Sequence, residues 1–82
     1  MKVVWVIMHS WKTGITSSVE IKGIFLNKQN AKDAFYTIAR EYYAEEHTNY
    51  KVSDWDDETY YAYKGSNYRH MWIETHLLED AE

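Results

Sequence analysis

Residues 27–46, NKQNAKDAFYTIAREYYAEE, are the stretch that decides the fold. Their apolar side chains recur every three or four positions, which is the spacing of one face of an α-helix. The residues of this stripe are Ala31, Ala34, Phe35, Ile38, Ala39, Tyr42 and Tyr43. Asn27 can act as the N-cap, because its short side chain can accept a hydrogen bond from a backbone N–H of the first turn. We therefore expect one amphipathic helix that packs its apolar stripe against the rest of the protein.

Strand-like runs flank this helix on both sides. Residues 2–9, KVVWVIMH, are apolar at odd and even positions alike, which predicts a strand in the interior of a sheet. Residues 19–25, VEIKGIF, alternate and would form a hairpin with the first run across a loop. After the helix, residues 59–63 and 68–78 are predicted to be two strands around the turn KGSN. The expected fold is α+β: a four-stranded, mainly antiparallel sheet with one helix packed on one face, in the order ββαββ.

The length and composition of the chain indicate one small domain over residues 1–82. A chain of this size buries only roughly 60% of its unfolded surface, which leaves room for one core. The sequence has no cysteine, so stability must come from packing, and we expect a cytoplasmic setting. No apolar run approaches the roughly 20 residues that cross a bilayer, so no membrane association is expected. Residues 79–82 are expected to form a flexible tail.

Acidic residues are concentrated in the second half of the chain, which has a net charge of -4 overall. Residues 1–39 carry five lysines and two acids, whereas residues 40–82 carry four basic residues and eleven acids. Glu45 and Glu46 stand at the end of the helix that its dipole makes unfavourable for anions, so they indicate a role other than helix stability. Residues 47–58, HTNYKVSDWDDE, are predicted to be a long acidic loop. Binding of DNA or RNA phosphates depends on basic contacts, so no direct nucleic-acid ligand is expected.

Metal and catalytic patterns are sparse. The carboxylates of the loop do not have the spacing of a calcium loop, because Thr59 and Gly65 stand where a glycine and a carboxylate are needed. Side chains two apart on a strand share a face, so Glu74, His76 and His70 form an alternative metal set. The simpler interpretation is that these are solvated side chains. The sequence has no phosphate-binding glycine loop, and one small sheet has little room for a catalytic pocket. We expect no enzymatic activity and no cofactor.

The aromatic residues indicate an exposed face. The fourteen aromatic side chains exceed what one small core can cover, because a single helix covers one face of a sheet. Trp72 shares one side of its strand with His70 and Glu74 and should face away from the helix, beside one of the two faces of the 2–9 strand. An apolar face of this kind usually contacts a partner or a second copy of the chain. The other interpretation is that long loops fold over it. Base stacking is less well supported, because acids outnumber basic residues on the neighbouring strands.

The stretch 21–35, IKGIFLNKQNAKDAF, combines a Gly-hydrophobic-aromatic strand end, a helix cap and alanines three positions apart. Together with a first strand that ends at His9 and an alternating strand over 73–77, it resembles an uncharacterised family of short bacterial and phage domains. The resemblance implies a ββαββ fold and brings no known activity, catalytic residue or cofactor. The chain departs from that pattern after the helix, where such domains make a short glycine-containing turn and this chain has the acidic residues 54–58.

Charge and aromatic content together favour a small acidic binding protein over an enzyme. Such a surface would attract a basic host protein by charge and hold it with aromatic anchors. The residues expected to contact the partner are Glu45, Glu46, Asp54, Trp55, Asp56, Asp57, Glu58, Tyr60 and Trp72. By analogy of fold and charge, the protein fits a phage-borne inhibitor that occludes the nucleic-acid-binding surface of an enzyme such as a nuclease, as anti-CRISPR proteins do. The alternatives are a small-ligand or metal-binding domain and a homodimer joined through the open face; the acids could also serve solubility alone.

Overall fold

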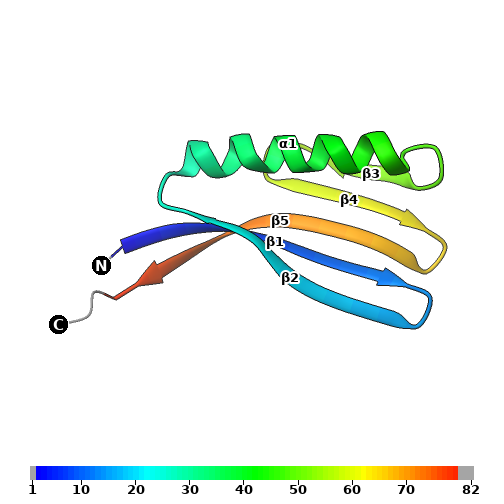
Figure 1. The fold of residues 1–82 in the computed structure, drawn as a ribbon, viewed down its shortest axis with the longest axis horizontal. Coiled ribbons are helices and arrows are strands. Elements are labelled where there is room, and N and C mark those ends of the chain that lie inside the picture. Colours follow the sequence, from blue (N-terminus) through cyan, green and yellow to red (C-terminus); the bar gives the residue numbers. More distant parts are fainter. Residues whose placement is uncertain (1, 80–82) are drawn as a thin grey trace.

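The computed structural model describes residues 2–79, which form one helix and a five-stranded antiparallel sheet (Figure 1). The elements are β1 (Lys2–Thr13), β2 (Thr16–Phe25), α1 (Lys28–Glu46), β3 (Lys51–Trp55), β4 (Thr59–Lys64) and β5 (Asn67–Leu78). The strand order in the sheet is β2-β1-β5-β4-β3, so β1 is an interior strand, as predicted. The α+β class, with a helix after the first two strands, is confirmed. The tail predicted at residues 79–82 lies outside the described residues, apart from Glu79.

The predicted number of four strands is wrong, because part of the expected acidic loop forms β3 within the described chain. Val52 and Trp55 of this strand pack against the core, which supplies apolar contacts that hold the short strand in the sheet. The pairing of β3 with β4 shifts register between Val52 and Asp54, so Ser53 is a bulge. The bulge interrupts the alternation of apolar and polar residues, and the segment therefore has the sequence pattern of a loop.

The first hairpin is longer than predicted. Strands β1 and β2 extend through most of residues 10–18, which were expected to form a loop, and they leave a two-residue turn. Gly14 has φ 64°, a left-handed conformation that glycine adopts readily and that suits the first position of such a turn. The side-chain oxygen of Asn67 accepts a hydrogen bond from the Gly14 N–H at 2.9 Å, which ties this turn to the start of β5.

A second bulge, in β2, changes which side chains share a face. Two successive residues of β1 pair with Gly23 and Ile21, so Lys22 is an extra residue in the ladder. Strict alternation along residues 19–25 would place Ile21 and Phe25 on one face. Instead, Phe25 packs against the core on the helix side, whereas Ile21 and Ile24 lie on the opposite side of the sheet.

Helix α1 packs against one face of the sheet and makes the core. Its predicted cap is confirmed, because the Asn27 side chain accepts a hydrogen bond from the Asn30 N–H at 3.1 Å. The predicted stripe is also confirmed, with Ala31, Phe35 and Ala39 fully buried. Their neighbours in the core come from β1, β4 and β5 and are Ile7, Tyr60, Ala62 and Met71.

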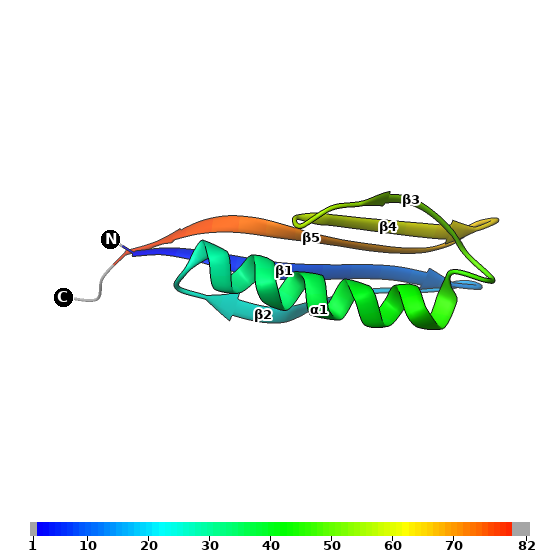
Figure 2. The same cartoon turned by 90° about the horizontal axis from the view of Figure 1, so that it is seen from above.

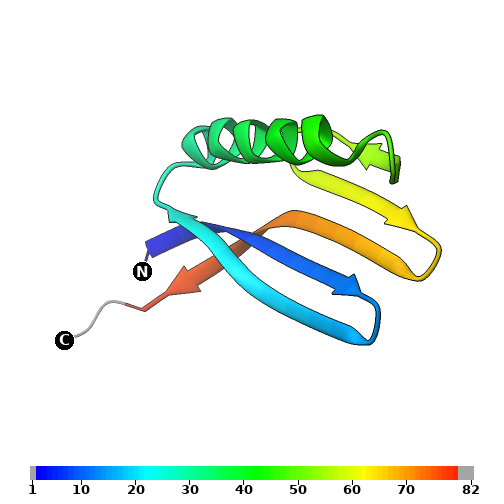
Figure 3. The ribbon, with the colours of Figure 1, turned by 45° about the vertical axis from the view of Figure 1, so that its right-hand side comes forward.

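The arrangement leaves the other face of the sheet open. Figure 2 shows α1 along one side of the strands, and Figure 3 shows the twist of the sheet, with β2 at one of its two edges. In Figure 1 the ends of β1 and β5 nearest the chain termini project beyond the start of α1. We call the face opposite α1 the open face.

Candidate protein-binding face

The open face carries apolar side chains where a solvated sheet face would be polar. The sequence left two choices for the residues of the first strand that accompany Trp72. The structure places Val4, Val6 and Met8 there, and Met8 pairs directly with Trp72. The sheet and α1 already form two packed layers, and the open face has the composition of a second buried surface.

A groove runs along β1 between β2 and β5. It has a volume of about 320 Å³ and is lined by Val4, Val6, Met8, Ile21, Ile24, Glu74, His76 and Leu78. The floor is closed, since Val4 and Val6 are only 3% and 7% exposed. The rim is open, since Ile21 is 57%, Ile24 61% and Leu78 49% exposed. Burying such a rim would remove a contiguous apolar surface from water.

Five half-buried rings continue this apolar surface along β5 and β4; we call them the aromatic row. They are Tyr61, Tyr63, Tyr68, His70 and Trp72. The Tyr61 ring lies 6.3 Å from that of Tyr68 and 5.5 Å from that of His70, and the His70 and Trp72 rings are 4.6 Å apart. Each ring covers its neighbour, so the row is a packed ridge and not a set of loose side chains. Burial in the row lowers the pKa of His70.

The alternative metal set is not brought together. Glu74 accepts hydrogen bonds from Trp72 Nε1 and from His76 Nε2, both at 2.8 Å, and these bonds lower its pKa. His70 instead stacks against Trp72. Among residues 2–79, no three histidine or carboxylate side chains are placed to hold one metal ion. Glu74 and His76 form a polar pair on the wall of the groove.

Three of the acids predicted to attract a partner make contacts within the chain, whereas Glu45 and Asp54 are exposed. Asp56 accepts hydrogen bonds from two backbone N–H groups of the β3–β4 turn, both at 2.8 Å, and so holds the turn. Asp57 lies 3.3 Å from the Lys32 ammonium, and Glu58 lies 3.5 Å from that of Lys28. Both lysines project from the first turns of α1. These solvent-screened ion pairs contribute little to stability, yet they reduce the negative charge that the turn offers to another molecule.

Two of the predicted aromatic anchors belong to the core. Trp55 is half-buried and its ring lies 4.8 Å from that of Tyr43 and 6.0 Å from that of Tyr60. Tyr60 is fully buried. Neither ring is free to enter a pocket on a partner, so among the three anchors only Trp72 lies on the open face.

Glu46 lies inside the protein although it was predicted to contact a partner. Its carboxylate accepts a hydrogen bond from Tyr60 OH at 2.7 Å and another from Arg69 Nε at 3.0 Å. Burial, together with the bond to this carboxylate, raises the pKa of Tyr60 well above its ordinary value. The unfavourable position of Glu46 at the helix end is thus offset by a tertiary ion pair with Arg69.

His9 extends this arrangement to β1 and β2. An arginine can only donate, so the 2.8 Å contact between Arg69 Nη1 and His9 Nε2 makes Nε2 an acceptor. The proton is then on Nδ1, which donates to Glu20 at 3.1 Å. His9 is 3% exposed, and burial lowers its pKa, so it is neutral near pH 7. We call His9, Glu20, Glu46, Tyr60 and Arg69 the polar network.

The sequence contained only a weak signal for the polar network. Its members come from β1, β2, α1, β4 and β5, far apart along the chain. The odd-position alternation of β5 places Arg69 on the same face as Met71, which is the apolar helix side. A charged residue at such a position requires a partner, but alternation alone does not say which one.

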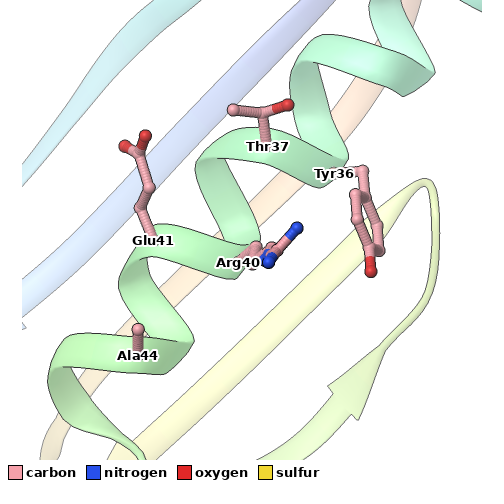
Figure 4. A pocket seen from close by; sticks show the side chains of 5 residues that line it. All are labelled: Tyr36, Thr37, Arg40, Glu41 and Ala44. Carbon is pink, nitrogen blue, oxygen red and sulfur yellow. The ribbon is translucent and has the colours of Figure 1, made fainter.

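A shallow depression on the outer surface of α1 is a weaker candidate site. Its volume is about 300 Å³, and its lining comes from α1 alone: Tyr36, Thr37, Arg40, Glu41 and Ala44. Figure 4 shows these side chains spread around the helix without converging on one point. A surface built by one element in this way does not enclose a ligand.

Comparison of the chain with protein-family models, with curated proteins and with solved structures gave no match. Within residues 2–79 there is no helix with the length and apolar character needed to cross a membrane.

Proposed function

We propose that the protein is a non-enzymatic binding module that holds another protein surface against its open face. The observation that carries this proposal is the continuous surface formed by the groove and the aromatic row, with exposed aliphatic side chains along the rim. Monomeric proteins rarely expose large contiguous apolar patches, and such patches usually mark contact sites. A partner with an apolar centre would complete a second core on this side of the sheet.

The arrangement of the titratable side chains supports binding over catalysis. Both ring nitrogens of His9 are engaged by Arg69 and Glu20, and the ring is almost completely buried. Glu74 and His76 are hydrogen-bonded to each other on the wall of a groove whose other lining side chains are aliphatic, apart from Met8. General acid–base chemistry needs a group that can reach a substrate proton, and the His9 arrangement does not offer one.

A basic protein partner is a second candidate, favoured by the exposed acids Glu41, Glu45 and Asp54. Under this hypothesis the protein would be an inhibitor that occludes the nucleic-acid-binding surface of a host enzyme. Its affinity would come from charge and would fall with added salt. The ion pairs of Asp57 and Glu58 with α1 lysines are the reason why we place the contact surface on the open face instead.

A small apolar ligand is the third candidate, because the groove volume of about 320 Å³ lies at the lower end of the range for ligand sites. The Glu74–His76 pair would then orient the polar end of the ligand. The exposed rim favours a flat protein surface over a small ligand as the binding partner, since ligand sites usually enclose most of the ligand.

The proposal is tested by capture of partners from a bacterial lysate at low and high salt on three immobilised proteins. These are the wild type, Ile24→Lys on the open face, and a turn variant with Asp57→Asn and Glu58→Gln. With soluble tagged copies of this chain added to the lysate, we expect the wild type and the turn variant to retain the same proteins at both salt concentrations, and Ile24→Lys to lose them. Loss with the turn variant alone, restricted to low salt, would instead support the basic partner.

A further inference from the structure

We infer that the surface bound by the open face is a second copy of this chain, so that two sheets pack face to face in a two-fold symmetric dimer. The inference rests on the proposed function and names the partner for the same surface. Each copy would contribute its groove and aromatic row, and each would cover those of the other. Two sheets about 10 Å apart would then share one core between two outer helices.

The shape of the single chain is the first argument. Its radius of gyration is 14.1 Å, and its extents are 49 × 26 × 15 Å. A compact domain of this length has a radius of gyration of roughly 12 Å. The molecule is therefore elongated and thin, as expected for half of a larger layered structure.

The area of the open face matches what a stable dimer buries. Strands β1 and β5 have 12 residues each and β2 has 10, so each of the three is roughly 35–40 Å long. With the shorter β4 and β3 and a strand spacing of about 4.8 Å, the face has a footprint of roughly 700 Å². A standard interface buries about 800 Å² on each partner. Complete burial of the face by an equal face is thus enough for a specific interface.

The charges of the open face permit self-association. Five charged side chains lie on this face, as their pairing with residues of the neighbouring strands shows. They are Lys2, Lys12, Lys51, Asp54 and Glu74. Three positive and two negative charges nearly balance, although the whole chain carries -4. Two copies therefore meet without the like-charge repulsion that the total charge would suggest. A strongly basic or acidic partner would find no matching charge here.

Packing through the face is favoured over pairing through the free edge of β2. The bulge at Lys22 disturbs the ladder in the middle of this strand, and Glu20 and Lys22 place charges beside it. Bulges and charged residues are the features by which edge strands resist pairing with another chain. The rim residues Ile21 and Ile24 of the same strand point onto the open face, where a second groove would bury them.

The test is the mass in solution, measured by sedimentation equilibrium from micromolar to submillimolar concentration. We expect the wild type to reach twice its 9.9 kDa. Ile24→Lys should raise the dimer dissociation constant by at least roughly 30-fold, because it places a charge in the apolar rim of both copies. Ile15→Lys is the matched control, because Ile15 is a fully exposed isoleucine at the β1–β2 turn, outside the groove. The dimer dissociation constant of this variant should equal that of the wild type.

Ile24 is itself 61% exposed, so the lysine variant should fold; far-UV circular dichroism and the equivalent Ile21→Lys variant check this. A wild type that stays monomeric over the whole range would overturn the inference, and so would an Ile24→Lys variant that dimerises as tightly as the wild type. If the wild type is monomeric but captures other proteins that the Ile24→Lys variant does not, the second copy is refuted and the proposed function is supported. A monomeric wild type whose groove binds an apolar dye, and loses it with Ile24→Lys, would overturn the second copy in favour of a small ligand.

Discussion

Replacement of the buried Glu46 by glutamine tests whether this acid stabilises the fold or contacts a partner. Its carboxylate accepts hydrogen bonds from Tyr60 OH and Arg69 Nε, and its side chain is only 11% exposed. Glutamine preserves the shape and one acceptor oxygen, but it removes the negative charge and turns an NH₂ group toward one of these donors. Arg69 would then keep its charge at a half-buried site without its counter-ion.

The expected loss in the free energy of unfolding is about 2–3 kcal/mol. Breaking a fully buried ion pair removes roughly 3–5 kcal/mol, but the Arg69 side chain is 24% exposed and water can solvate part of its charge. A domain of this length has a stability of roughly 4–12 kcal/mol, so the substitution would remove a large share of it. The midpoint of thermal unfolding should fall by roughly 10–20 °C.

Urea unfolding followed by circular dichroism measures this loss, with Glu45→Gln as the matched control. Glu45 precedes Glu46 on α1 and is exposed, so its substitution should change stability by less than about 0.5 kcal/mol. A Tyr60→Phe background should reduce the effect of Glu46→Gln, because the two side chains share a hydrogen bond. If Glu46→Gln were as mild as Glu45→Gln, the polar network would have no stabilising role, and the placement of Glu46 as a structural residue would be refuted.

Three further predictions concern pH and turns. The folded state holds the pKa of His9 below its ordinary value of 6.5. Just below that pH, His9 therefore gains a proton in the unfolded chain but not in the folded one. The free energy of unfolding should be constant above about pH 7 and fall as the pH drops through 6.5. His70 acts in the same direction, and thermal melts of His9→Gln against wild type between pH 7.5 and about 5 isolate the share of His9. Gly14→Ala should remove about 1 kcal/mol by backbone strain, because the site has open space but a φ of 64°; an unchanged urea midpoint would contradict this. Asp56→Ala should remove about 1 kcal/mol by leaving two turn N–H groups unpaired, whereas Asp57→Ala should remove less than half of that in the same assay.

Features that depend on local spacing were predictable from the sequence. The stripe of α1 and the Asn27 cap are set by residues within a few positions of one another, and both are confirmed. Strand β3 was not predictable, because its five residues join the sheet only through contacts of Val52 and Trp55 with distant core side chains. The face of β1 that lies opposite the helix could not be chosen from the sequence either, since both of its faces are apolar. The bulge at Lys22 was not predictable because it arises in the pairing of β2 with β1.

The candidate site was predictable only in part. Trp72 was expected on the face away from the helix because β5 alternates, and it lies there. Composition showed that acids and aromatic residues are numerous, but it could not distinguish exposed from buried members. Glu46 and Tyr60 became internal because each provides the hydrogen bond that the other needs, and their positions in the chain are too far apart for a periodic pattern to show this.

The pairing of β1 with β5 determines when the sheet can form during synthesis. Strand β1 is made before β5, and it gains its second neighbour only when residues 67–78 are available. Until then the β1–β2 hairpin and α1 can form from local contacts, but β1 has a free edge and an apolar surface on both sides. Folding of the sheet is therefore dominated by contacts between distant parts of the chain, which slows it and lengthens the time in which that edge can pair with other nascent chains.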